Sequence, residues 1–144
     1  MVSISTSNLK VKLVPNTYTG SVTFAIGSGS FTVQVTLIVQ AAPNLSANTN
    51  SLTGSTNCSS SNSTYLCYVT LTNDSSSSSL TWTYSQKLIP SLVAKPTSFT
   101  LAPGRSERVP LYISQNDCSS GAQIVFTGPN NSVTLYWYCY PPIG

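Results

Sequence analysis

Four cysteines carry the most specific chemistry in this sequence: Cys58, Cys67, Cys118 and Cys139. Thiols can bind zinc or form disulfides. A four-thiolate zinc site is typically built from paired C-x-x-C motifs, whereas the gaps between successive cysteines here are 8, 50 and 20 residues. An even number of cysteines in a chain rich in Ser and Thr favours two disulfides and an oxidising compartment.

The disulfide pairing stays open, because four cysteines allow three connectivities. We favour Cys118–Cys139, since Cys118 lies just before the sixth predicted strand and Cys139 lies on the neighbouring seventh. The same choice leaves Cys58–Cys67 as a local staple of one loop. The other two connectivities remain alternatives.

Acid–base groups are scarce. The chain has no histidine, which excludes Ser-His and Cys-His nucleophile pairs. Its three acids, Asp74, Glu107 and Asp117, fall in different loops or strand edges, so they suggest neither a carboxylate pair nor a calcium cage. Serines are too abundant to single out a Ser-Lys pair. We therefore expect no enzymatic activity, no metal and no cofactor.

Five Asn-x-Ser/Thr sequons are possible glycosylation sites, and four of them fall in predicted loops. The candidates are Asn44, Asn57, Asn62, Asn73 and Asn130. A chain rich in Asn, Ser and Thr also produces sequons by chance, and glycosylation needs a suitable host. Modification is therefore a hypothesis.

Three tyrosines, Tyr136, Tyr138 and Tyr140, alternate with apolar residues near the C-terminus and form a row on the outer face of a predicted strand. Aromatic rows can stack on sugar rings, which would make this a carbohydrate-binding surface. The alternative, which we favour, is contact with a neighbouring domain or with cross-strand neighbours.

Composition favours an extracellular protein. Charged residues make up only 6% of the 144-residue chain, against about 25% in typical soluble domains. Hydroxyl and amide side chains must therefore keep the surface soluble. The net charge of +3 is scattered, so no basic stripe for nucleic acid is present. No apolar run is long enough to span a membrane, and residues 1–30 lack a signal peptide pattern.

Alternation of apolar and polar residues predicts an all-β protein without helical periodicity. Strands are predicted at 7–14, from 18, at 31–39, one or two within 44–53, at 65–73, 80–85, 108–114, 122–127 and 132–140, with short extended pieces at 92–93 and 99–101. A polar loop is predicted at 54–64. The strands after residue 43, with frequent turns and an inward Trp82, predict an immunoglobulin-like β-sandwich.

An internal repeat of about 100 residues relates the two ends of the chain. Leu9, Val11 and Leu13 match Val109, Leu111 and Ile113, and the 31–39 strand matches 131–139. Tyr18 and Gly20 align with Cys118 and Gly121. We therefore predict that 43–144 is a complete domain and that 1–42 is the C-terminal half of another, a three-strand meander that needs completion. The candidates for strand complementation are Leu9, Val11, Leu13, Val33, Val35 and Leu37.

The pattern Leu-x-Val-x-Leu-x-Pro-x-Thr-Tyr-x-Gly-x-Val-x-Phe at 9–24, followed by a Gly hairpin, resembles bacterial immunoglobulin-like tandem repeats of the BACON type. The second copy, with Cys67-Tyr-Val-Thr-Leu-Thr-Asn and Trp137-x-Cys139, is similar to cysteine-containing variants in large cell-surface proteins. The resemblance implies a non-enzymatic spacer, stalk, filament or adhesive module at the cell surface. Its expected partners are further copies or neighbouring repeats, with polysaccharide as the alternative.

Overall fold

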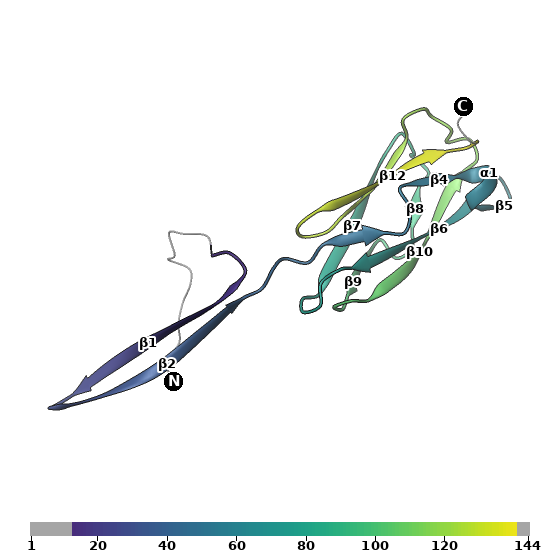
Figure 1. Cartoon of the computed structure of the whole chain (residues 1–144). Coiled ribbons are helices and arrows are strands. Elements are labelled where there is room, and N and C mark those ends of the chain that lie inside the picture. Colours follow the sequence, from purple (N-terminus) through teal and green to yellow (C-terminus); the bar gives the residue numbers. More distant parts are fainter. Residues whose placement is uncertain (1–12, 141–144) are drawn as a thin grey trace. The chain divides into compact units, whose positions relative to one another are not determined.

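The computed structural model describes residues 13–140 (Figure 1). The chain divides into two compact units, Met1–Ala41 and Ala42–Gly144, and each is described by itself. The predicted strand at 7–14, with Leu9 and Val11, lies almost entirely outside the described residues.

The first unit contains one antiparallel hairpin, formed by β1 (Asn16–Ile26) and β2 (Gly29–Val39). Its two-residue turn lies between the paired residues Ile26 and Gly29, and Gly27 has a φ of 58°. A positive φ at the first turn residue suits the right-handed twist of the two strands, and glycine adopts it without steric cost.

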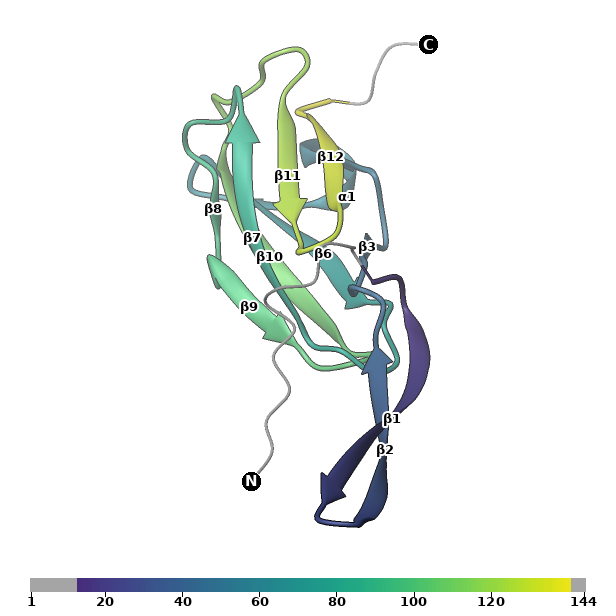
Figure 2. The ribbon, with the colours of Figure 1, turned by 90° about the vertical axis from the view of Figure 1, so that its left-hand side faces the viewer.

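The second unit is the predicted immunoglobulin-like β-sandwich. One sheet has the order β3 (Leu45–Ala47), β6 (Thr64–Asn73), β10 (Ser106–Ser114) and β8 (Val93–Ala94), with β5 (Ser59–Ser61) also pairing with β6. The other has the order β4 (Ser51–Thr53), β12 (Ser132–Tyr138), β11 (Gln123–Thr127), β7 (Leu80–Lys87) and β9 (Ser98–Leu101). Figure 2 shows β7, β11 and β12 side by side in one layer, with β6 and β10 behind them. Among the described strands, β4 and β12 are the one parallel pair.

Alternating side chains of both sheets build a single core. On β6 the buried residues include Cys67, Val69 and Leu71, and on β12 they are Leu135 and Trp137. Further buried positions are Leu80, Trp82, Val109, Leu111, Ile113, Ile124 and Phe126. The inward faces predicted from the period of two are confirmed, and the core residues among 13–140 all belong to the second unit.

The segment predicted as a polar loop at 54–64 is partly regular, because it contains the helical turn α1 (Gly54–Asn57) and strand β5. The Asn57 side chain accepts the Thr53 N–H at 3.0 Å, which ties the turn to β4. Four residues are too few to show a helical period, so sequence analysis missed them. None of the helical structure in residues 13–140 is long and apolar enough to span a membrane.

Strand β12 ends at Tyr138, two residues earlier than predicted. The chain bends at Cys139, whose carbonyl accepts the Ser55 N–H at 3.1 Å and whose sulfur is bonded to Cys118. These two connections hold Cys139 out of the sheet ladder.

A three-strand meander was predicted for residues 1–42 from their match to the last three strands of the second unit. Those three strands, β10 to β12, do not form a meander. Strand β10 pairs with β6 and β8, whereas β11 and β12 belong to the opposite sheet. The first of these three consecutive strands therefore lies in one sheet, and the next two lie side by side in the other. For residues 1–42, the position of the first predicted strand stays a prediction.

The hairpin registers also correct the alignment of the repeat. Val33 faces Val22 and Val35 faces Gly20, while Val133 faces Phe126 and Leu135 faces Ile124. If β2 corresponds to β12, Gly20 corresponds to Ile124 and not to Gly121. The sequence match missed this because the β1–β2 hairpin is longer than its counterpart.

Candidate functional site

The register of β1 and β2 puts the apolar residues of the hairpin on one face. Directly paired residues of antiparallel strands share a face, and these pairs include Val22 with Val33 and Phe24 with Phe31. We call this surface the apolar hairpin face; its residues are Tyr18, Gly20, Val22, Phe24, Ile26, Phe31, Val33, Val35, Leu37 and Val39. The opposite face is mainly Thr, Ser and Gln.

None of these side chains is buried. Phe31 is 50% exposed and Val33 is 44% exposed, and Ile26 near the turn reaches 68%. A two-stranded hairpin is at best marginally stable in water, and an exposed apolar face of this size marks a contact surface. Three of the complementation candidates, Val33, Val35 and Leu37, lie on this face.

The apolar hairpin face has a raised end and a hollow. Near the turn, the rings of Phe24 and Phe31 stack with centroids 5.0 Å apart. Farther along, Gly20 has no side chain, and a shallow hollow opens there between Tyr18, Val22, Val35 and Leu37. Nothing lies within 4 Å of the position that a Cβ at Gly20 would occupy.

The hairpin carries no charge, because residues 13–40 contain no Asp, Glu, Lys or Arg. Within the described residues, β1 and β2 pair only with each other, so each has an open outer edge. In the second unit, β12 is enclosed by β4 and β11. Charged side chains usually block the pairing of open edges, and this hairpin lacks that protection.

The structure joins Cys58 to Cys67 and Cys118 to Cys139, with Cα–Cα distances of 4.3 and 5.3 Å. This is the connectivity favoured above. The first bond ties the segment after α1 to β6, and the second ties the β10–β11 loop to the end of β12. Two disulfides indicate an oxidising environment, extracellular or periplasmic.

The tyrosine row is uneven. Tyr136 and Tyr140 are 45% and 71% exposed, whereas Tyr138 is only partly exposed, and Tyr140 lies beyond the end of β12. Tyr138 and Tyr140 line a hollow next to the disulfide of Cys118 and Cys139. The row therefore offers two exposed rings and a shallow depression.

The sequon asparagines differ in solvent exposure. Asn73 is fully buried: its Nδ2 donates to the carbonyls of Ser78, Leu101 and Ala102, and its Oδ1 accepts the Ser75 N–H. A glycan on Asn73 is incompatible with this fold, which corrects one candidate.

Asn62 is an accessible candidate, because it lies exposed at the turn between β5 and β6 with a φ of 49°. Asn44, Asn57 and Asn130 are also exposed, but all three side-chain amides take part in hydrogen bonds. Asn130 Nδ2 donates to Asn44 Oδ1.

Sequence analysis did not single out the tyrosines on the outer face of β6 and β10. The Arg108 guanidinium lies 3.5 Å from the centroid of Tyr68, and Lys95 Nζ lies 5.1 Å from that of Tyr112. Each cation lies over one face of its ring, and Tyr112 also lines a shallow hollow with Asn62 and Leu66. The only sequence signal was the alternation of these tyrosines with buried residues.

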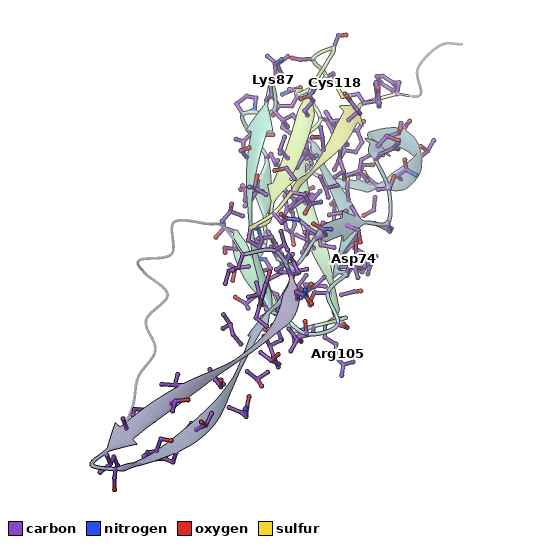
Figure 3. All side chains as sticks on the ribbon, turned by 60° about the vertical axis from the view of Figure 1, so that its left-hand side comes forward. Asp74, Lys87, Arg105 and Cys118 are labelled. Carbon is purple, nitrogen blue, oxygen red and sulfur yellow. A yellow bond between two sulfur atoms is a disulfide. The ribbon has the colours of Figure 1, made fainter. Side chains whose placement is uncertain are left out.

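Two of the three acidic residues accept local hydrogen bonds. Asp117 Oδ2 accepts the Ser91 N–H, and Asp74 Oδ1 accepts the Ser46 hydroxyl, each at 2.8 Å. Figure 3 shows Lys87 and Cys118 at one end of the sandwich and Asp74 and Arg105 toward the other. Among the described residues, no three His, Cys, Asp or Glu side chains converge as metal ligands.

No family model matches this sequence, and no curated protein matches it. Among solved structures, the chain is similar to the crystal structure of the periplasmic chaperone SfaE, with a TM-score of 0.50 and 8% sequence identity. The match covers 70% of this chain and 61% of that chain, so it spans less than two thirds of the chaperone. At this identity the likeness shows the fold alone.

Proposed function

We propose that this chain is a non-enzymatic structural module of an extracellular stalk or filament at a cell surface. In this proposal, residues 1–42 associate with further copies or neighbouring repeats, by β-strand complementation or tandem stacking. The sandwich of the second unit acts as a rigid, disulfide-stapled spacer. The resemblance to BACON-type repeats is consistent with this role.

The observation that carries the proposal is the contrast between the two units. The second unit buries its apolar residues in a core, whereas among the described residues the hairpin leaves its apolar face and both outer edges open. A long, uncharged, open hairpin is a template for pairing with another chain. Its burial in an assembly would remove that hazard.

The disulfides and the low charge support an extracellular setting. Structural disulfides persist in oxidising compartments, and a surface of hydroxyls and amides replaces charge as the source of solubility. Neither feature implies chemistry on a substrate.

Electron microscopy of the full chain produced in an oxidising compartment tests the proposal. We expect ordered assemblies that are lost in Leu37→Asp, which places a charge on the apolar hairpin face. The matched control is Thr36→Asp, one residue away on the polar face, which should assemble normally. A wild-type chain that stays monomeric at all concentrations would contradict the proposal.

A second candidate function, carbohydrate binding or adhesion, is favoured by the exposed rings of Tyr136 and Tyr140 and by the hollow that Tyr138 and Tyr140 line. Exposed aromatic rings bind sugars by stacking on their apolar faces. Polysaccharide pull-down would detect such binding. Binding that survives Tyr136→Ser combined with Tyr140→Ser would rule out this surface, and Tyr112→Ser, on β10 of the other sheet, is the control.

A further inference from the structure

The apolar hairpin face is self-complementary in the sizes of its side chains. Along the hairpin, the cross-strand pairs alternate between bulky and small about a centre at Val22 and Val33. On one side of that centre lie the stacked rings of Phe24 and Phe31. At the same distance on the other side lies the pair of Gly20 and Val35, where the hollow opens.

The next pairs outward continue the pattern on β2, where Leu37 has Gly29 as its counterpart at the other end. On β1, Tyr18 has Ile26 as its counterpart. A two-fold axis that lies between two facing hairpins and crosses the strands at Val22 and Val33 would place Phe24 over Gly20 and Leu37 over Gly29. The two-fold axis requires this reciprocity, since residue i contacts residue j and j contacts i.

From this pattern we propose that the occupant of the apolar hairpin face is the same face of a second copy of this chain. The strands of the two copies stack β1 over β1 and β2 over β2 in opposite directions. Phe24 and Phe31 of one copy fill the hollow at Gly20 of the other, and Val33 lies against Val33 across the two-fold axis. The inference rests on the proposed structural role and names the partner of its open hairpin.

Charge and polarity fit this occupant. The hairpin has no charged side chain that would be buried or repelled when two copies meet. The opposite face, with Thr17, Thr19, Ser21, Thr32 and Gln34, would stay in water on both sides of the resulting sandwich. Sheets that pack face to face lie about 10 Å apart, and the interdigitating side chains of the two copies would fill that space.

The predicted strand with Leu9, Val11 and Leu13 is the competing occupant. Its counterpart in the second unit, β10, lies in the sheet opposite β11 and β12. The experiment below therefore has to separate a cover supplied within one chain from one supplied by a second copy.

The size of the surface sets the strength of the contact. Two 11-residue strands give a face about 37 Å long and about 10 Å wide, or about 400 Å² per copy. The pair would bury about 800 Å², below the roughly 1,200 Å² of stable complexes. The contact by itself is therefore weak, and linked repeats would strengthen it by raising the effective concentration.

A charge-swap experiment on the full chain tests this arrangement. Sedimentation equilibrium from micromolar to millimolar concentration should show wild-type self-association. Val33→Lys and Val33→Glu should each stay monomeric, because like charges meet on the two-fold axis, and an equimolar mixture should associate again. Gln34→Lys and Gln34→Glu, on the polar face, are the matched controls and should behave as wild type. Circular dichroism should show the same thermal unfolding of the sandwich in all variants.

Each other result would overturn the inference. Association of Val33→Lys alone, or failure of the mixture to associate, would exclude face-to-face pairing at this axis. Filaments that form equally well with Val33→Lys would also exclude this pairing, but they would leave the proposed structural role intact. A monomeric wild type whose hairpin amides resist hydrogen exchange would show that the face is covered within one chain.

Discussion

Asn73 holds together one end of the sandwich, and we predict that Asn73→Ala is among the most destabilising polar substitutions in the second unit. The residue is fully buried at the end of β6. Its amide connects that strand to the Ser75–Ser78 loop and to the chain after β9. Alanine would leave these backbone groups without their partner.

The magnitude follows from the bonds that are lost. Two N–H groups of Asn73 are shared among three carbonyls, at 2.8, 3.2 and 3.2 Å, and the carbonyl oxygen accepts one N–H at 3.0 Å. At about 1 kcal/mol for each of three net bonds, the loss is about 3 kcal/mol, and unsatisfied buried groups can raise it further. That is a large part of the stability of an ordinary domain.

Urea denaturation of the full chain with its disulfides intact measures this loss. The matched control is Asn48→Ala, which removes one exposed hydrogen bond, from the Thr70 N–H to Asn48 Oδ1 at 2.8 Å. We expect the control to lose about 0.5–1 kcal/mol. The reasoning is refuted if Asn73→Ala loses no more free energy of unfolding than Asn48→Ala at an unchanged slope.

Three further predictions concern the same unit. Replacing Cys118 and Cys139 by Ala, 21 residues apart, should cost about 3 kcal/mol, and replacing Cys58 and Cys67, 9 apart, about 2.5 kcal/mol; equal unfolding midpoints for both variants and wild type would contradict this. Trp137→Phe should cost about 1–2 kcal/mol more than Trp82→Phe in denaturation, because the Trp137 indole donates to the Asp117 carbonyl at 2.7 Å whereas that of Trp82 has no acceptor among the described residues. In a host that glycosylates sequons, peptide mass spectrometry should find sugar on Asn62 and none on Asn73, and the reverse occupancy would contradict the burial of Asn73.

The period of two in the sequence was sufficient to predict the sandwich and its inward faces. Cys67, Val69 and Leu71 alternate with Thr and Tyr, and burial follows that alternation. The turn at Gly27 was equally readable, since glycine there allows a positive φ. These features are local, and local patterns specify them.

Which strands pair with each other could not be predicted in the same way. Alternation tells which side of β10 faces inward but not which sheet contains it, so the meander was assumed. The parallel pairing of β4 with β12 joins a three-residue strand to one far along the chain. The burial of Asn73 depends on carbonyls of Ser78 and Leu101, which no spacing near Asn73 reveals.

The apolar hairpin face was only partly foreseen. Val33, Val35 and Leu37 were singled out from β2, but the register that aligns them with Val22, Gly20 and Tyr18 comes from the structure. The hollow at Gly20 and the ring pair of Phe24 and Phe31 depend on that register.

Hydrogen exchange of the full chain as a function of its concentration tests the central claim most directly. If the hairpin is covered by association with another copy, backbone amides between Tyr18 and Leu37 should become protected as the concentration rises. The amides of β6 and β10, in the sandwich of the second unit, should keep the same protection throughout. Exchange of the hairpin that does not depend on concentration, in a range where the chain assembles, would contradict the account.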